Sequence, residues 1–236
     1  MELQGKKVLV FGSGKSGIGA SDLLAKVGAS PIIYDGNAEI DKEAVVHKTD
    51  GTYPVEVYAG ELPKEVQESL DLVVLSPGVP TDLPLVKSFY EKGLPVWSEV
   101  ELAYRTGKGE VLAITGTNGK TTTTALLGKI MGDACESVFV VGNIGTPYTN
   151  AAADTREDSV IVAELSSFQL ESIHTFHPKV SAVLNITPDH LNRHHTMEAY
   201  IRAKMNIAKN QTAEDVCVLN YEDEETRKMA DEFQAS

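Results

Sequence analysis

Short apolar runs alternate with amphipathic stretches along nearly the whole chain. The apolar runs lie at residues 7–11, 30–34, 71–75, 94–97, 111–114, 160–163, 180–184 and 216–219. Helical patterns fill residues 18–27, 99–105 and 197–209, and a threonine-rich helix is expected after residue 120. Uniformly apolar strands that alternate with helices are typical of parallel sheets covered on both faces. The predicted fold class is therefore α/β with parallel sheets.

The alternation is interrupted by the polar, glycine-rich stretch at residues 106–109, after which a fresh strand begins. We therefore expect two domains. The first is a Rossmann-like parallel-sheet domain at residues 1–97. The second is an α/β domain of the phosphate-loop ATPase type at residues 98–236.

The composition narrows the class of protein. Of 236 residues, 42% are hydrophobic and 23% are charged, as in a globular protein. The net charge of −13 disfavours non-specific binding of nucleic acid, because phosphate backbones attract basic surfaces. No apolar run approaches the roughly 20 residues that cross a bilayer, and no signal peptide opens the chain. Cys135 and Cys217 are too few for a disulfide framework, so we expect a cytoplasmic protein that binds neither nucleic acid nor membrane.

A glycine-rich loop between a predicted strand and a predicted helix carries the strongest chemical signal. It reads Gly116-Thr117-Asn118-Gly119-Lys120-Thr121-Thr122. Backbone N–H groups and the helix dipole hold phosphates in such a loop. Lys120 would reach the β- and γ-phosphates, and the Thr121 hydroxyl would coordinate Mg²⁺. Ile114 stands where the longer Walker pattern has a glycine, so this is a shorter variant. The loop predicts ATP with Mg²⁺ as its ligand.

A second glycine motif, Gly12-Ser13-Gly14-Lys15-Ser16-Gly17, follows the first predicted strand and opens a helix. Asp35 ends the next strand, at about the spacing of an acid that binds a ribose. By themselves these features suggest NAD. The motif specifies only close approach of the backbone to a diphosphate, however, and a tight turn without a ligand is an open alternative.

Chemically active side chains also follow two later strands. Glu164 ends one of them, and Asp189 and His190 come a short turn after the other. Ligands of parallel sheets lie beyond the carboxyl ends of the strands. If these strands neighbour the phosphate loop, Glu164 and His190 face the triphosphate and could hold a divalent metal. His190, His194 and His195 raise zinc as an alternative, but no cysteine or further carboxylate stands at a zinc-like spacing.

Further motifs lie at residues 114–122, 142–145, 164–171 and 185–191. Together they resemble the Mur ligases, the ATP-dependent amino-acid-adding enzymes of peptidoglycan synthesis. Residues 164–170, Glu-Leu-Ser-Ser-Phe-Gln-Leu, and residues 76–80, Ser-Pro-Gly-Val-Pro, resemble in particular the member that adds D-glutamate. The resemblance runs along essentially the whole chain.

This resemblance implies an order of events. ATP would phosphorylate the carboxylate of UDP-N-acetylmuramoyl-L-alanine to an acyl phosphate, and the amine of D-glutamate would then displace the phosphate. Such a reaction needs charge neutralisation around the transferring phosphoryl group more than a protein nucleophile. Lys120 and Mg²⁺ would supply that neutralisation, with Thr121 and Glu164 on one metal ion.

The resemblance also implies roles for individual residues. His190 matches a position that binds a second Mg²⁺ and contacts the substrate, and it joins Lys120 and Lys204 as a catalytic residue. Lys204, which by pattern alone is an exposed helical lysine, matches a lysine that is carbamylated and so becomes a metal ligand. The implied substrate-binding positions are Lys15, Ser16 and Gly17 on the diphosphate, Asp35 on the uracil, and Gly78, Asn143, Ser166 and His190 elsewhere on the substrate.

Mur ligases have three domains, and this sequence matches the first and part of the second. We therefore expect a monomeric ligase whose central domain is incomplete here, whose closing domain is absent, and which is inactive in this form. One local departure is Asn192, where the family more usually has aspartate. The alternatives are a non-catalytic fragment that binds the UDP-substrate and ATP, an NAD-binding oxidoreductase, and a folylpolyglutamate synthetase, whose ATP domain is related.

Overall fold

The computed structural model describes residues 2–143 and 145–230, which form two parallel sheets. The first sheet contains β1 (Lys7–Phe11), β2 (Ser30–Asp35), β3 (Glu56–Ala59), β4 (Leu72–Leu75) and β5 (Val96–Ser98), in the spatial order β3-β2-β1-β4-β5. The second contains β6 (Glu110–Thr115), β7 (Val138–Gly142), β8 (Val160–Glu164), β9 (Val180–Val183) and β10 (Val216–Leu219), in the order β10-β9-β6-β8-β7. The predicted α/β class with parallel sheets is confirmed.

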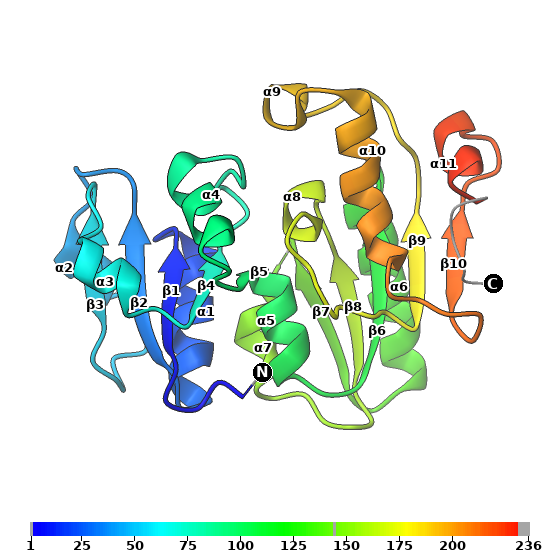
Figure 1. Ribbon diagram of the computed structural model, residues 1–236. Coiled ribbons are helices and arrows are strands. Elements are labelled where there is room, and N and C mark those ends of the chain that lie inside the picture. Colours follow the sequence, from blue (N-terminus) through cyan, green and yellow to red (C-terminus); the bar gives the residue numbers. More distant parts are fainter. Residues whose placement is uncertain (1, 144, 231–236) are drawn as a thin grey trace.

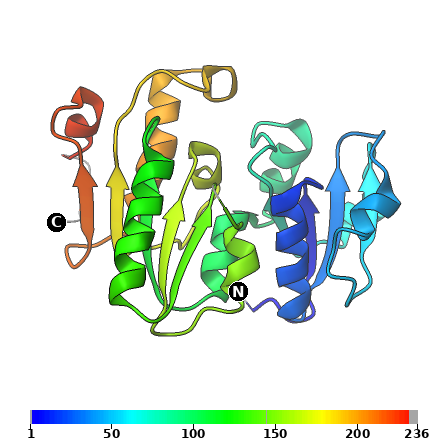
Figure 2. The same cartoon turned by 180° about the vertical axis from the view of Figure 1, so that it is seen from behind.

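Helices cover the faces of both sheets. They are α1 (Lys15–Lys26), α2 (Lys42–Val46), α3 (Lys64–Glu68), α4 (Pro84–Glu91), α5 (Glu99–Thr106), α6 (Lys120–Ala134), α7 (Tyr148–Ala152), α8 (Ser167–Leu170), α9 (Leu191–His194), α10 (Met197–Met205), a 3₁₀ turn (Asn206–Ala208) and α11 (Glu224–Met229). Figure 1 shows α10 in front of the second sheet. In the view from behind, Figure 2, α1 and α6 lie in front of the first and second sheets.

The inner strands of the first sheet are buried on both faces, which explains why they are apolar without interruption. Alternate strand residues point to opposite faces. On one face, Leu9 and Val73 belong to a core that Phe89 of α4 closes. On the other, Val8 and Val74 belong to a core that runs on through α1, α5 and α7 into the second sheet. The two sheets therefore share one packed boundary, which Figure 1 shows as α5 and α7 between them.

Helix α5 carries the chain from the first sheet to the second and is anchored beside the second. The fully buried carboxylate of Glu101 accepts hydrogen bonds from the backbone N–H groups of His174, Thr175 and Phe176, and from Nε of Arg105. Burial alone would raise the pKa of Glu101, but these hydrogen bonds together lower it. The start of the helix is fixed by Ser98, whose hydroxyl caps the Glu101 N–H.

Strands β3 and β7 were not predicted from the sequence. Both are edge strands, and neither is uniformly buried; Val140 of β7 is 36% exposed. An edge strand faces a partner on only one side and can carry polar residues, so its hydrophobic pattern is weak.

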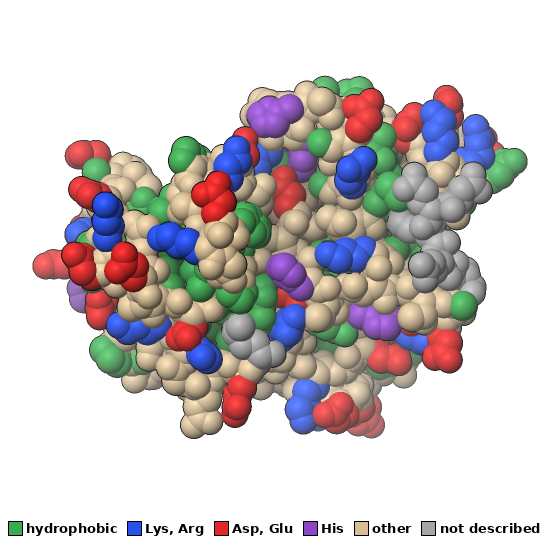
Figure 3. Space-filling model, in the orientation of Figure 1, with side chains coloured by type: hydrophobic (Ala, Val, Ile, Leu, Met, Phe, Trp, Pro, Cys, Tyr) green, Lys and Arg blue, Asp and Glu red, His purple; other side chains and the backbone are tan. Residues whose placement is uncertain are grey.

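The surface carries charges of both signs. On the face seen in Figure 3, Lys and Arg side chains are interspersed with Asp and Glu rather than gathered in one basic patch. Within residues 2–143 and 145–230, no helix has both the length and the apolar character needed to cross a membrane.

Candidate functional site

The phosphate loop joins β6 to α6 and is braced by the segments that follow β9. The Thr117 N–H donates to Asn185 O at 2.9 Å, and the Asn118 N–H donates to Asn185 Oδ1 at 2.8 Å. The Thr117 hydroxyl donates to Thr187 O at 3.1 Å and lies 3.0 Å from the Tyr200 hydroxyl. These bonds hold the loop in a single shape without using the N–H groups of the first turn of α6, which have no partner within the helix.

Two lysines meet at this loop. Lys120 Nζ donates to Gly116 O and Thr117 O, each at 2.9 Å. Lys204, on α10, donates to the same Gly116 O at 2.8 Å and is only 2% exposed. The pattern-based view of Lys204 as an exposed helical lysine is therefore wrong. Burial, followed by the positive charge of Lys120, lowers the pKa of Lys204 to about 7, so much of this amine is neutral near pH 7.

Glu164 ends β8, which pairs with β6, so it lies beside the start of the phosphate loop. Its side chain is 1% exposed, and Oε1 accepts a hydrogen bond from Asn143 Nδ2 at 2.8 Å. Among the described residues, Oε2 has no hydrogen-bond partner. A buried carboxylate oxygen without a partner is costly unless a cation or donor satisfies it. This oxygen therefore fits a divalent metal ion, which the exposed Thr121 and Thr122 at the start of α6 could also approach.

His190 approaches from the other side of the loop, because β8 and β9 flank β6. The strands that precede Glu164 and His190 are therefore neighbours of the strand that precedes the phosphate loop, as the predicted pairing of these two residues required. His190 has a left-handed backbone (φ 52°), its ring lies 4.9 Å from that of Phe168, and its Nε2 lies 3.4 Å from Asp189 Oδ2. In the part of the chain that is described, no three His, Cys, Asp or Glu side chains cluster closely enough to hold a metal by themselves, so zinc gains no support.

The first glycine motif opens onto a pocket of about 550 Å³ with walls from both sheets. Of the predicted substrate positions, five line this pocket and three do not. Those that line it are Lys15, Ser16, Asp35, Gly78 and Asn143; those that do not are Gly17, Ser166 and His190. Lys15 Nζ bridges the walls by donating to Gly145 O at 3.0 Å. Ile144, inside one of the predicted motifs, lies outside the described residues.

Asp35 is already engaged within its own wall of the pocket. Its Oδ2 accepts from the Ser13 N–H at 3.0 Å and the Ser13 hydroxyl at 2.6 Å, and its Oδ1 accepts from the Asn37 N–H at 3.0 Å. Burial pushes the pKa of Asp35 upward, but these hydrogen bonds outweigh it and lower the pKa. The carboxylate therefore stays charged and fixes the shape of the glycine loop.

Two buried residues at the pocket were not predicted: Gln169 lines the pocket, and Glu99 lies against Gln169. Gln169 Oε1 accepts from the Ser166 N–H at 2.8 Å and from the Ser166 hydroxyl at 3.0 Å, while its Nε2 donates to Glu99 Oε1 at 2.8 Å. Glu99 is 2% exposed, and burial raises its pKa to about 7. The spacing of Ser166 and Gln169 is that of a capping box and could have identified Gln169. No local pattern identifies Glu99, because its burial comes from contacts distant in sequence.

The fold and the site together define a class of α/β protein that binds two phosphate-bearing ligands. Two parallel α/β sheets each present a glycine-rich loop at the carboxyl end of the central strand. The pocket between the sheets is connected to the phosphate loop through Asn143 and Glu164. This arrangement suits two phosphate-bearing ligands bound side by side.

Comparison with known protein families then places the chain. Residues 114–236 match the family described as Mur ligase middle domain, and residues 6–98 match the one described as Mur ligase MurD-like, N-terminal domain. The chain belongs to the Mur ligase family. Mur ligases are ATP-dependent enzymes that need Mg²⁺.

The chain is similar over its whole length to curated bacterial ligases. It is 58% identical over 236 residues to the UDP-N-acetylmuramoylalanine–D-glutamate ligase of Lachnoclostridium phytofermentans, covering 100% of this chain and 52% of that protein. It is 49% identical over 236 residues to the ligase of the same name from Clostridioides difficile, with the same coverage of 100% and 52%. The chain spans about half the length of the curated relatives it matches.

Solved structures confirm the fold. A UDP-N-acetylmuramate:L-alanyl-γ-D-glutamyl-meso-diaminopimelate ligase from Neisseria meningitides superposes with a TM-score of 0.62 at 16% identity, covering 98% of this chain and 77% of that one. The UDP-N-acetylmuramate–alanine ligase of Thermotoga maritima superposes with a TM-score of 0.53 at 23% identity, covering 95% of this chain and 51% of that one. At these identities the likeness concerns the fold alone.

Proposed function

We propose that this protein is an ATP-dependent ligase that adds D-glutamate to UDP-N-acetylmuramoyl-L-alanine during peptidoglycan precursor synthesis. The observation that carries the proposal is the hydrogen bond between Asn143 and Glu164, 2.8 Å long. It joins a residue of the pocket between the sheets to a carboxylate beside the phosphate loop. The names of the relatives support this choice of substrates. We further propose that the protein acts as a monomer in the cytoplasm.

The UDP-substrate is assigned to the pocket between the sheets. Lys15 and Ser16 would contact its diphosphate, with Gly17 supporting the loop from behind, and Asp35 would contact the uracil. Gly78, Asn143, Ser166 and His190 would hold the muramoyl and alanyl portion. Support comes from the walls of the pocket, which bring five of these residues together.

The reaction has two steps. A carboxylate oxygen of the alanyl group attacks the γ-phosphorus of ATP, the bond to the bridging oxygen breaks, and ADP leaves. The amine of D-glutamate then attacks the acyl carbon, phosphate leaves, and the nitrogen loses a proton. Both steps demand alignment and charge neutralisation. Lys120 would exchange its two carbonyl partners for phosphate oxygens, and the first-turn N–H groups of α6 would bind the remaining charge.

Magnesium, when bound, would neutralise the phosphate oxygens and orient them. Thr121 and Glu164 would hold one ion, and His190 and Lys204 would hold a second. The unpartnered, buried Oε2 of Glu164 supports this donor set. Phosphate oxygens and water would complete each shell, since Mg²⁺ keeps several water ligands.

Lys204 can serve as a metal ligand only after carbamylation. The neutral amine attacks carbon dioxide, a nitrogen–carbon bond forms, and the nitrogen releases one proton to solvent. A pKa of about 7 makes the neutral amine available, and the neighbouring Lys120 favours the negative product. A carbamate signal in bicarbonate labelled with carbon-13, absent in Lys204→Ala, supports the ligand; no signal in the unaltered protein removes Lys204 from the donor set.

The proposal is tested by measuring phosphate release from ATP with both substrates present. The measurement uses this chain and, in parallel, the chain extended to the length of its relatives. We expect release that requires D-glutamate from the extended chain and none from this chain alone. In the extended chain we expect Lys120→Ala to lower kcat/KM by about 10³-fold, or about 4 kcal/mol of transition-state stabilisation. Lys129→Ala is the matched control, because Lys129 lies on the same helix in an exposed pair with Asp133.

Turnover near the normal rate in Lys120→Ala would reject the role given to the loop. Calorimetric binding of the UDP-substrate without turnover in either protein would favour the non-catalytic alternative. The oxidoreductase alternative has no support among the families and relatives above, and binding of NAD in place of the UDP-substrate would be needed to revive it.

A further inference from the structure

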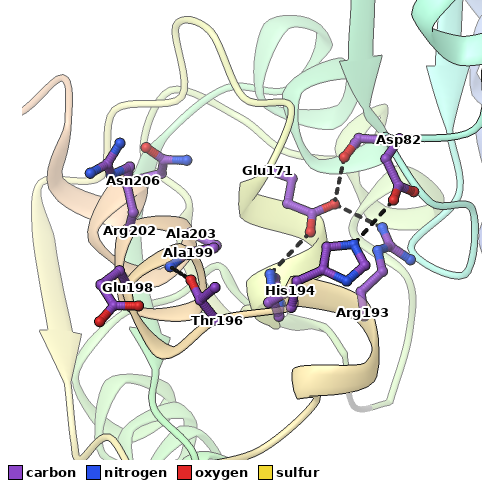
Figure 4. A pocket seen from close by; sticks show the side chains of 12 residues that line it. Asp82, Glu171, Arg193, His194, Thr196, Glu198, Ala199, Arg202, Ala203 and Asn206 are labelled. Atoms are coloured by element: carbon purple, nitrogen blue, oxygen red, sulfur yellow. Dashed lines mark hydrogen bonds and ion pairs between the residues drawn. The ribbon is translucent and has the colours of Figure 1, made fainter.

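Arg193, on α9, reaches from the second sheet to a loop of the first. Its Nη2 donates to Val79 O at 3.0 Å and to Glu171 Oε2 at 2.8 Å, and its Nη1 lies 3.4 Å from Pro77 O. Thr81, on the same loop, donates to Glu171 Oε2 at 3.4 Å. Figure 4 shows the Glu171 carboxylate reaching toward Arg193, with Asp82 of the same loop beside them. We call Arg193 and Glu171 the interdomain clamp.

The loop held by the clamp forms part of the substrate pocket. Residues 76–79 line that pocket, and the Ser76 hydroxyl donates to Gly12 O at 3.4 Å. Gly78 sits between the two carbonyl groups that accept from Arg193. In a trans peptide the N–H points opposite to the C=O. Because the Pro77 carbonyl faces Arg193, the Gly78 N–H must face away from it and is held there as a donor.

The other end of the clamp reaches the phosphate-loop side. The Arg193 guanidinium lies 4.6 Å from the centre of the Phe168 ring, and the same ring lies 4.9 Å from that of His190. His190 is the N-cap residue of α9, the short helix that also carries Arg193. Arg193, Phe168 and His190 therefore form one continuous packed contact.

The ion pair of the clamp lies within the second sheet's part of the chain, and it is better protected from solvent than the ionic contact of His195 with Asp82, which joins the two parts. Arg193 and Glu171 have only 12% and 14% of their side chains exposed, whereas His195 and Asp82, 3.2 Å apart, have 67% and 53% exposed. Exposed pairs contribute little because water and salt screen them, while a charge-assisted bond shielded from solvent is stronger. The pair with Glu171 therefore holds the Arg193 guanidinium in place, and the bonds of Arg193 to Val79 O and Pro77 O fix the loop of the first part against it.

We propose that Arg193 is a positioning residue for the ligase reaction, which fixes the loop at residues 76–80 against α9 so that Gly78 and His190 keep one relative geometry. The inference rests on the proposed function and names a residue that acts through loop carbonyls and a ring, without touching the reacting atoms. Lysine cannot replace it, because one ammonium group does not present the planar fork that reaches separate acceptors and stacks on an aromatic ring.

The experiment combines hydrogen exchange with binding and kinetics. In Arg193→Gln and Arg193→Lys we expect the Val79 N–H, which donates to Ser76 O at 2.9 Å, to exchange about 10-fold faster. Calorimetry should show about 10-fold weaker binding of UDP-N-acetylmuramoyl-L-alanine, while KM for ATP stays within about twofold. Arg202→Gln is the matched control: Arg202 lines the pocket of Figure 4, and none of the described residues forms an ion pair with it.

Unchanged exchange at residues 76–80 in Arg193→Gln would overturn the proposal whether or not the ligase assignment holds, because exchange requires no turnover. Equal losses for ATP and the UDP-substrate, with a lower melting temperature, would also overturn it by making the role merely structural. Glu171→Gln adds a further test: if the two residues act as one unit, the double variant is no worse than Arg193→Gln alone. If exchange and binding change as expected in the Arg193 variants but the unaltered extended chain shows no turnover, the proposed function is rejected. The proposal that Arg193 positions the loop would then be retained.

Discussion

The two glycine-rich loops occupy equivalent places but are built by different means. Each follows the central strand of its sheet, β1 in one and β6 in the other. Helix α1, which follows the first loop, is packed against α5 and α7 and buries most of its residues from Gly17 to Leu24. Helix α6, which follows the second, buries only Thr124 and Gly128 among its residues.

This difference separates a loop shaped by packing from a loop shaped by hydrogen bonds. The first loop needs close contact between backbone segments and lies in a pocket that the second sheet completes. The second loop is braced by Asn185 and contacted by Lys120 of α6 and Lys204 of α10. The helix that follows it, α6, is largely exposed to solvent. Substitutions in the first loop should therefore damage folding, and those in the second should mainly damage ligand chemistry.

The largest expected effect on stability is that of Gly17→Ala. A Cβ at Gly17 would lie 1.8 Å from Gly12 O and 2.9 Å from Gly12 C, so the backbone of the loop must move. Overpacking against backbone costs about 3 kcal/mol. We expect the free energy of unfolding, measured by urea denaturation, to fall by that amount, which lowers the urea midpoint. Gly14→Ala is the matched control in the same loop, because a Cβ there meets no atom within 4 Å.

If Gly17→Ala and Gly14→Ala lower the urea midpoint equally, packing does not shape the first loop and the contrast between the loops disappears.

Much of this architecture could be predicted from local sequence. The central strands β1, β6 and β8 are buried on both faces, and a strand in that position must be apolar throughout. The loops after β1 and β6 could be predicted because each phosphate-type turn requires glycine at fixed spacing. The edge strands β3 and β7 could not, since the outer side of an edge strand carries no such requirement, although the apolar edge strands β5 and β10 were predicted.

The parts of the site that local pattern does not indicate depend on contacts between distant residues, and Lys204 among them was predicted only through the family resemblance. Lys204 follows a helical pattern typical of an exposed side chain, yet α10 carries it to Gly116, far away in the sequence. Glu99 is buried by α8 and reaches Gln169. Arg193 reaches Val79 O because one sheet packs against the other. A local pattern carries no information on such partners.

A smaller effect is expected in α5, the helix between the two regions. Burial raises the pKa of Glu99 to about 7 from an ordinary 4.5, so the native protein holds a proton that the unfolded chain releases in this window. Stability therefore falls as pH rises from 4.5 to 7. In Glu99→Gln this loss is absent, and we expect the variant to be about 2 kcal/mol more stable than the parent at pH 8 and equal to it near pH 4.

Glu101→Gln is the matched control on the same helix. The contribution of Glu101 to stability should change with pH in the opposite direction to that of Glu99. Its lowered pKa stabilises the native state above pH 4.5, and that contribution is lost as pH falls. Urea unfolding at several pH values measures both. A difference between Glu99→Gln and the parent that does not change with pH would show that Glu99 is not a buried, protonated group.

The smallest effect is expected for Gly119→Ala, in the second loop. Gly119 has a left-handed backbone, φ 82° and ψ −5°, and a Cβ there would meet only Leu184 Cδ1 at an ordinary 3.7 Å. The cost is conformational, about 1–2 kcal/mol for an L-residue, and the reduced freedom of the unfolded chain returns about 0.5 kcal/mol. We expect a net loss of about 1 kcal/mol in urea unfolding, with less for Gly119→Asn, because asparagine tolerates this conformation. A loss of stability as large as that of Gly17→Ala would mean that both loops are shaped by packing. The contrast between the two loops, and the role given to the exposed helix α6 in it, would then be wrong.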